Sequence, residues 1–60
     1  MSESIIKSIV RVALGHLKAG KFTFENFGIT FTIEKLEKTQ HTYAVMANTQ
    51  NPFCVAHITA

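Results

Sequence analysis

The 60-residue chain predicts an α+β fold in which an N-terminal amphipathic helix packs on one face of a four-stranded antiparallel meander sheet, in the order α-β-β-β-β. Two hydrophobic periods carry this prediction. Apolar residues recur about every 3.6 residues from Ser4 to Ala19, as in a helix, and every second residue after Gly20, as in strands. The connections between consecutive strand segments are short, which favours antiparallel neighbours. We therefore expect one small α+β domain that spans residues 1–60.

The helical segment carries signals for both of its ends. Ser2 or Ser4 can cap the N-terminus, and Glu3 is favourably placed in the first turn. Gly20 suits the left-handed position that follows many helices. The core-facing stripe repeats at intervals of three and four residues and comprises Ile6, Ile9, Val10, Ala13 and Leu17. Such a stripe requires a sheet to cover it.

Four segments rich in β-branched and aromatic residues follow the helix, and each reads as a strand. Strands are expected at 22–24, 29–33, 41–47 and 53–59, with turns at 25–28 and 38–40 and a loop at 48–52. Alternation assigns to the core Phe22, Phe24, Ile29, Phe31, Ile33, Tyr43 and Val45. The second face carries Thr23, Thr30, Thr32, Glu34, Ala44 and Met46. One helix cannot cover both faces, so the second face is a candidate partner surface.

The composition limits the classes of function. A chain of this length removes only about 60% of its unfolded surface on folding, so its own core is marginal. Cys54 is the single cysteine, which excludes an internal disulfide, and the three histidines match no zinc spacing. Small domains without such cross-links often gain stability by oligomerising. We therefore expect a homo-oligomer, most simply a dimer, with no cofactor.

The N-terminus lacks the unbroken apolar stretch of a secretion signal, because Lys7 and Arg11 interrupt it. No segment approaches the roughly 18 apolar residues of a membrane span. A lone cysteine fits a reducing compartment. The sequence thus predicts a cytoplasmic protein that has no membrane partner.

Positive charge gathers in the helical third of the chain, although the formal net charge of the whole is only +2. Lys7, Arg11 and Lys18 fall within about 40° on a helical wheel, and Lys21 follows the helix. Such a basic ridge can contact phosphates, and binding would then weaken with salt. The alternative function is accordingly a nucleic-acid-binding dimer that uses Lys7, Arg11, Lys18 and Lys21.

Cys54 and His57 are the pair of residues that most invites a catalytic or metal-binding interpretation. On a regular strand, residues three apart point to opposite faces, so neither a hydrogen-bonded dyad nor chelation forms without a bulge. Cys54 is then expected to behave as a small buried apolar residue. We expect no catalytic residue, no metal ligand and no enzymatic activity, since the common catalytic motifs are also missing.

An exposed aromatic residue on a tight turn suits the centre of a protein interface, and Phe27 occupies such a turn. The expected interface lies on the second sheet face or on a rim formed by Phe27, His41 and the loop at 48–51. The candidate protein-binding residues are Phe27, Thr30, Thr32, His41, Tyr43, Asn48, Gln50 and Asn51.

The favoured function is a non-enzymatic protein-interaction module that self-associates and binds a larger protein as an inhibitor or adaptor. Small virus-encoded inhibitors of host defence, anti-CRISPR proteins among them, illustrate this class by their size and lack of catalytic chemistry.

Overall fold

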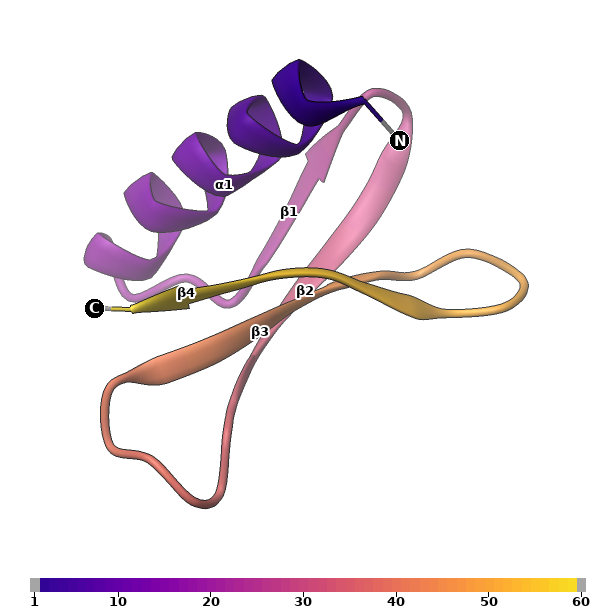
Figure 1. The fold of residues 1–60 in the computed structure, drawn as a ribbon. Coiled ribbons are helices and arrows are strands. Elements are labelled where there is room, and N and C mark those ends of the chain that lie inside the picture. The colour runs from indigo at the N-terminus through magenta and orange to yellow at the C-terminus, as the bar shows by residue number, and fades with distance from the viewer. Residues whose placement is uncertain (1, 60) are drawn as a thin grey trace.

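The computed structural model describes residues 2–59, which form one helix and one four-stranded sheet (Figure 1). The elements in chain order are α1 (Glu3–Lys18), β1 (Thr23–Asn26), β2 (Ile29–Lys35), β3 (Thr42–Ala47) and β4 (Phe53–Thr59). The sheet has the order β1-β2-β3-β4, and every neighbouring pair is antiparallel. The predicted α-β-β-β-β meander is therefore confirmed.

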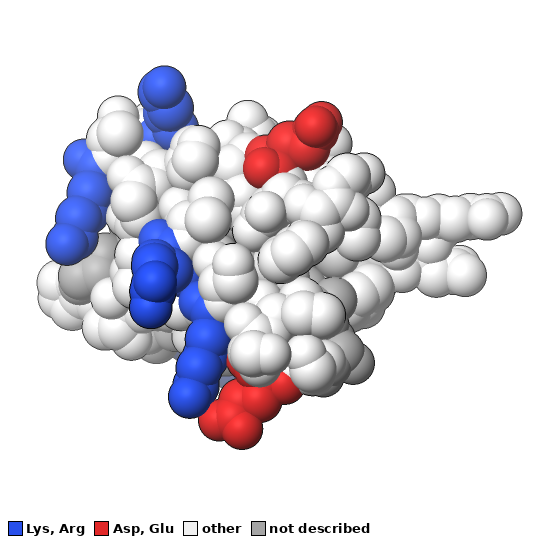
Figure 2. Space-filling view, turned by 90° about the horizontal axis from the view of Figure 1, so that it is seen from above, with Lys and Arg blue, Asp and Glu red and all other residues white. Residues whose placement is uncertain are grey.

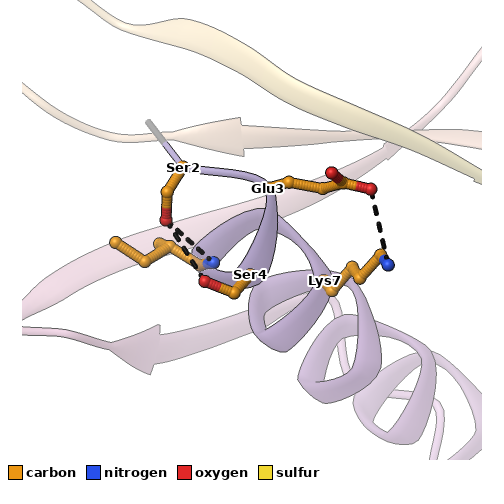
Figure 3. A network of polar contacts seen from close by, with 5 residues as sticks. Ser2, Glu3, Ser4 and Lys7 are labelled. Carbon is orange, nitrogen blue, oxygen red and sulfur yellow. Dashed lines mark hydrogen bonds and ion pairs between the residues drawn. The ribbon is translucent and has the colours of Figure 1, made fainter.

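The first turn of α1 is capped by Ser2, whose side-chain oxygen accepts a hydrogen bond from the backbone N–H of Ile5 at 3.4 Å (Figure 3). The hydroxyl of Ser4 lies 3.4 Å from that of Ser2 in the same network. Glu3 forms an ion pair with Lys7 one turn later, at 3.4 Å between Oε1 and Nζ. Of the two serines that could cap the helix, the structure thus selects Ser2.

Gly20 ends the helix as expected, with a positive φ of 75°. The N–H of Lys21 donates to the carbonyl of His16 at 2.9 Å, and the N–H of Gly20 donates to that of Leu17 at 3.0 Å. These two bonds form a Schellman motif, which satisfies carbonyls that the end of a helix leaves free. The motif turns the chain back toward β1.

The core lies between α1 and the face of the sheet that the helix covers. Its largest fully buried side chains are Ile9, Phe31 and Val45. Aromatic rings extend from the helix into the sheet: the ring of His16 lies 5.3 Å from that of Phe24, which stacks on Phe31 at 5.0 Å. The helix contacts the two edge strands, β1 and β4 (Figure 1).

Two expectations about β1 and β2 are wrong in detail. Phe22, which alternation assigns to the core, is 50% exposed. It precedes β1 at the edge of the sheet, where no further strand among the described residues covers it. Asn26 belongs to β1 and pairs with Ile29, so the connection is a two-residue turn and not the four-residue turn expected at 25–28.

A bulge interrupts the pairing of β3 with β4. Met46 pairs with Cys54, whereas the preceding residue, Val45, pairs with Ala56, so Val55 is the extra residue. A bulge of this kind shifts the alternation of every residue beyond it. In contrast, β2 runs without interruption to Lys35 and ends there, two residues beyond the strand end expected at 33.

Candidate functional site

Phe27 and Gly28 form the turn between β1 and β2, and both have positive φ, 53° and 71°. Two consecutive left-handed residues define the turn type that best matches the twist of a hairpin, for which asparagine and glycine are preferred. An aromatic residue in this conformation is unusual and costs about 1–2 kcal/mol. Phe27 is also 57% exposed, so more than half of its surface faces the solvent. The turn holds this ring in the solvent at the end of the hairpin.

The outward face of the sheet, opposite α1, brings three of the candidate residues together. Asn48 follows β3, and its side-chain amide donates to the hydroxyl of Thr32 at 2.6 Å. Its backbone N–H donates to the carbonyl of Thr30 at 2.9 Å. Thr30 and Thr32 on β2, together with Asn48 after β3, therefore form a continuous polar surface that leads toward the turn at Phe27.

The loop at 48–52 leaves the same end of the sheet as the turn at Phe27, but the twist of the sheet carries the two connections apart (Figure 1). Within the loop, the hydroxyl of Thr49 donates to the carbonyl of Asn51 at 2.9 Å. Gln50 and Asn51 are exposed.

The rim expected from Phe27, His41 and the 48–51 loop does not exist. His41 is exposed in the connection between β2 and β3, which leaves the opposite end of the sheet. Tyr43, another candidate protein-binding residue, does not lie with the others, since it is half-buried and packs against the core on the helix side. Antiparallel topology explains the first difference, because successive connections alternate between the two ends of a sheet.

The four cations of the predicted ridge are all exposed, namely Lys7, Arg11, Lys18 and Lys21. Figure 2 views the molecule from the side of α1 and shows Lys and Arg side chains spread over this side, with acidic groups at its margins. The ion pair with Glu3 partly neutralises Lys7. The basic ridge is therefore present but weaker than a helical wheel suggests.

The orientation expected for Cys54 and His57 is wrong, because the bulge at Val55 places both on the outward face. Cys54 pairs with Met46 and His57 pairs with Ala44, and both partners occupy outward positions of β3. Cys54 is exposed and not buried as expected. Its thiol donates a long hydrogen bond, 3.6 Å, to the carbonyl of Ala56. Sequence reasoning therefore missed the grouping of Met46, Cys54 and His57.

One buried polar atom near the hairpin turn has no hydrogen-bond partner in the described part of the chain, the side-chain nitrogen of Asn26. A buried amide without a partner costs about 1–3 kcal/mol. This cost falls on the residue directly before the strained Phe27. The hairpin end thus combines two features that lower stability.

No pocket is found in the described part of the molecule, and no three His, Cys, Asp or Glu side chains of residues 2–59 gather to hold a metal ion. No helix among these residues has the length and apolar character needed to cross a membrane. Neither a family model nor a curated protein nor a solved structure matches the chain.

Proposed function

We propose that this chain is a non-enzymatic protein-interaction module that binds a larger protein through the hairpin end at Phe27 and the adjoining polar surface of Thr30, Thr32 and Asn48. The observation that carries the proposal is the exposed aromatic ring of Phe27 at a φ of 53°. Strain of this kind is concentrated at functional sites, where the conformation serves recognition. At this position asparagine would relieve the backbone strain, but only a large apolar side chain such as that of Phe27 can fill a pocket of a partner.

The size of the molecule sets the extent of the interface. A standard interface covers about 800 Å² on each partner, which is roughly a fifth of the 4215 Å² surface of this chain. The hairpin turn alone is too small for that area. The outward face of β2 extends it, because Thr30 and Thr32 lie on the strand that leaves the turn.

The test is a comparison of Phe27→Asn with Phe22→Asn. Both variants remove an exposed aromatic ring, but only Phe27 has a positive φ and lies at the hairpin turn. A partner captured by the wild-type protein from its native cells is purified, and its affinity for each variant is measured by calorimetry. We expect Phe27→Asn to weaken binding at least about tenfold, as hot-spot truncations do, and Phe22→Asn to leave it near the wild-type value. Equal affinities for the wild type and Phe27→Asn would sink the proposal.

Self-association is the second part of this proposal. Besides Phe27 and the control position Phe22, two large apolar side chains are exposed over the described residues, namely Ile5 and Phe53. Burying such residues between two copies would supplement a marginal core. Multi-angle light scattering at micromolar concentration is expected to give the mass of a dimer. A stable monomer under those conditions would remove this part.

The alternative function is a nucleic-acid-binding dimer. A positive result in the salt test below would exclude an inhibitory or adaptor role. The basic side chains on the α1 side of the molecule support this alternative (Figure 2). Each phosphate contact contributes to a steep loss of affinity with salt. Binding to DNA or RNA that collapses with added salt and requires Arg11 and Lys18 would favour the alternative. Protein binding that survives salt and requires Phe27 favours the interaction module.

A further inference from the structure

The bulge in β4 creates a grouping of side chains that a regular strand would separate. Met46, Cys54 and His57 occupy outward positions on two neighbouring strands. Cys54 lies directly across from Met46, at a separation between Cβ atoms of about 4.5–5.5 Å for such pairs. His57 pairs with Ala44, two residues before Met46, which makes His57 a diagonal neighbour of Met46 at about 7–8 Å. Long side chains span that distance.

The burial of Ala44 indicates that side chains converge at this place. Ala44 faces away from α1, yet it is only 6% exposed. Its outward neighbours therefore close over it, and these are Thr42 and Met46 along β3 and His57 and Glu34 across from it. The thiol of Cys54 leans along its own strand in the same direction, since its sulfur lies 3.6 Å from the carbonyl of Ala56, which is bonded to His57.

We propose that Met46, Cys54 and His57 bind a soft monovalent metal ion, Cu(I). A thioether, a thiolate and an imidazole form a ligand set that selects this ion over Mg²⁺ or Ca²⁺, which require oxygen ligands. Zn²⁺ prefers four ligands without thioether, and the three proposed ligands include only one thiolate and one imidazole. No three His, Cys, Asp or Glu side chains gather among the described residues, so the thioether of Met46 completes the ligand set.

Binding at this site changes no oxidation state. The thiol of Cys54 releases its proton to solvent, which breaks its weak hydrogen bond to the carbonyl of Ala56. A bond then forms between the thiolate sulfur and the copper ion. The surrounding charge favours a cation. The outward positions of the four strands include Glu25 and Glu34 but no Lys or Arg. The site adjoins the proposed binding surface, because Met46 pairs with Thr32, but the inference does not depend on the proposed function.

The experiment titrates Cu(I) under anaerobic conditions against bicinchoninic acid, a chromogenic competitor, and counts bound ions by native mass spectrometry. Three variants each remove one ligand, namely Met46→Leu, Cys54→Ser and His57→Gln. Leucine conserves the volume of methionine, and Cys54 and His57 are exposed, so all three are expected to fold. The matched control is His41→Gln, an exposed histidine at the other end of the sheet. Far-UV circular dichroism verifies the fold of each.

We expect one Cu(I) ion per chain and an affinity that falls at least about tenfold in each of the three variants, while His41→Gln matches the wild type. X-ray absorption is expected to show two sulfur neighbours and one nitrogen neighbour around copper. Wild-type affinity in Met46→Leu and His57→Gln would reduce the site to an isolated thiol and overturn the proposal. A stoichiometry of one ion per two chains would overturn it as well, because the ion would then bridge thiols of different copies.

Discussion

Replacing Ile9 by alanine tests whether the buried face of α1 is what holds the helix on the sheet. Ile9 is 1% exposed in the middle of the core, whereas Ile5, one turn earlier on the same helix, is 38% exposed. The two substitutions change the same atoms and the same intrinsic helix propensity. Any difference between Ile9→Ala and Ile5→Ala therefore reports burial.

The expected magnitudes follow from the exposed fractions. Burying the three carbons that distinguish isoleucine from alanine contributes about 0.8 kcal/mol each. Ile5 is roughly three-fifths buried, which gives a loss of about 1.5 kcal/mol before the better helix propensity of alanine recovers a few tenths. At Ile9 the full transfer term applies and a cavity remains, for a loss of about 2–5 kcal/mol. Ile9→Ala is thus expected to lose at least about 1 kcal/mol more than Ile5→Ala.

Urea unfolding followed by far-UV circular dichroism measures both losses. A folded chain of this length has a total stability of about 3–9 kcal/mol, so Ile9→Ala is expected to remove a large share of it. Ile9→Val, with an expected loss of about 0.5–1.5 kcal/mol, keeps the comparison measurable if the alanine variant unfolds. Equal losses for Ile5→Ala and Ile9→Ala would refute the placement of α1 on the sheet.

Three further predictions concern local structure. Ser2→Ala is expected to lose about 0.5–1 kcal/mol in urea unfolding, the lower part of the range for caps, because the bond to Ile5 is long at 3.4 Å; no loss would show that another residue caps α1. Gly28→Ala is expected to lose about 1 kcal/mol or more, because its φ is 71° and nothing lies within 4 Å of the added carbon; an unchanged melting temperature would contradict that backbone conformation. Glu3→Gln is expected to change stability by less than about 0.5 kcal/mol, since both members of the ion pair with Lys7 are exposed; a larger loss would mean that the pair does more than the geometry of Figure 3 indicates.

The helix and its ends could be predicted because their signals are local. Capping by a serine, the apolar stripe through Ile9 and the left-handed Gly20 each depend on residues within a few positions of one another. The same holds for the hairpin turn, since Gly28 has the expected positive φ. That Phe27 shares this conformation was not predicted, because the sequence preference at that position favours asparagine.

The candidate site could be predicted only in part, because its members are joined by strand pairing. Thr30 and Thr32 share a face by alternation, but the bond from Asn48 to Thr32 depends on the register of β3 against β2. The expected grouping of His41 with Phe27 is wrong, because antiparallel connections alternate between the two ends of the sheet.

The sequence by itself determined that this chain forms one helix and four strands in meander order, because hydrophobic period and turn residues act over short distances. The tertiary structure alone decided which face the residues of β4 occupy. A bulge of one residue, Val55, sends Val55 and Ile58 toward the core and Cys54 and His57 outward. The physical reason is that the fit of β4 against β3 and the core outweighs regular alternation, and that fit exists only once the strands have paired.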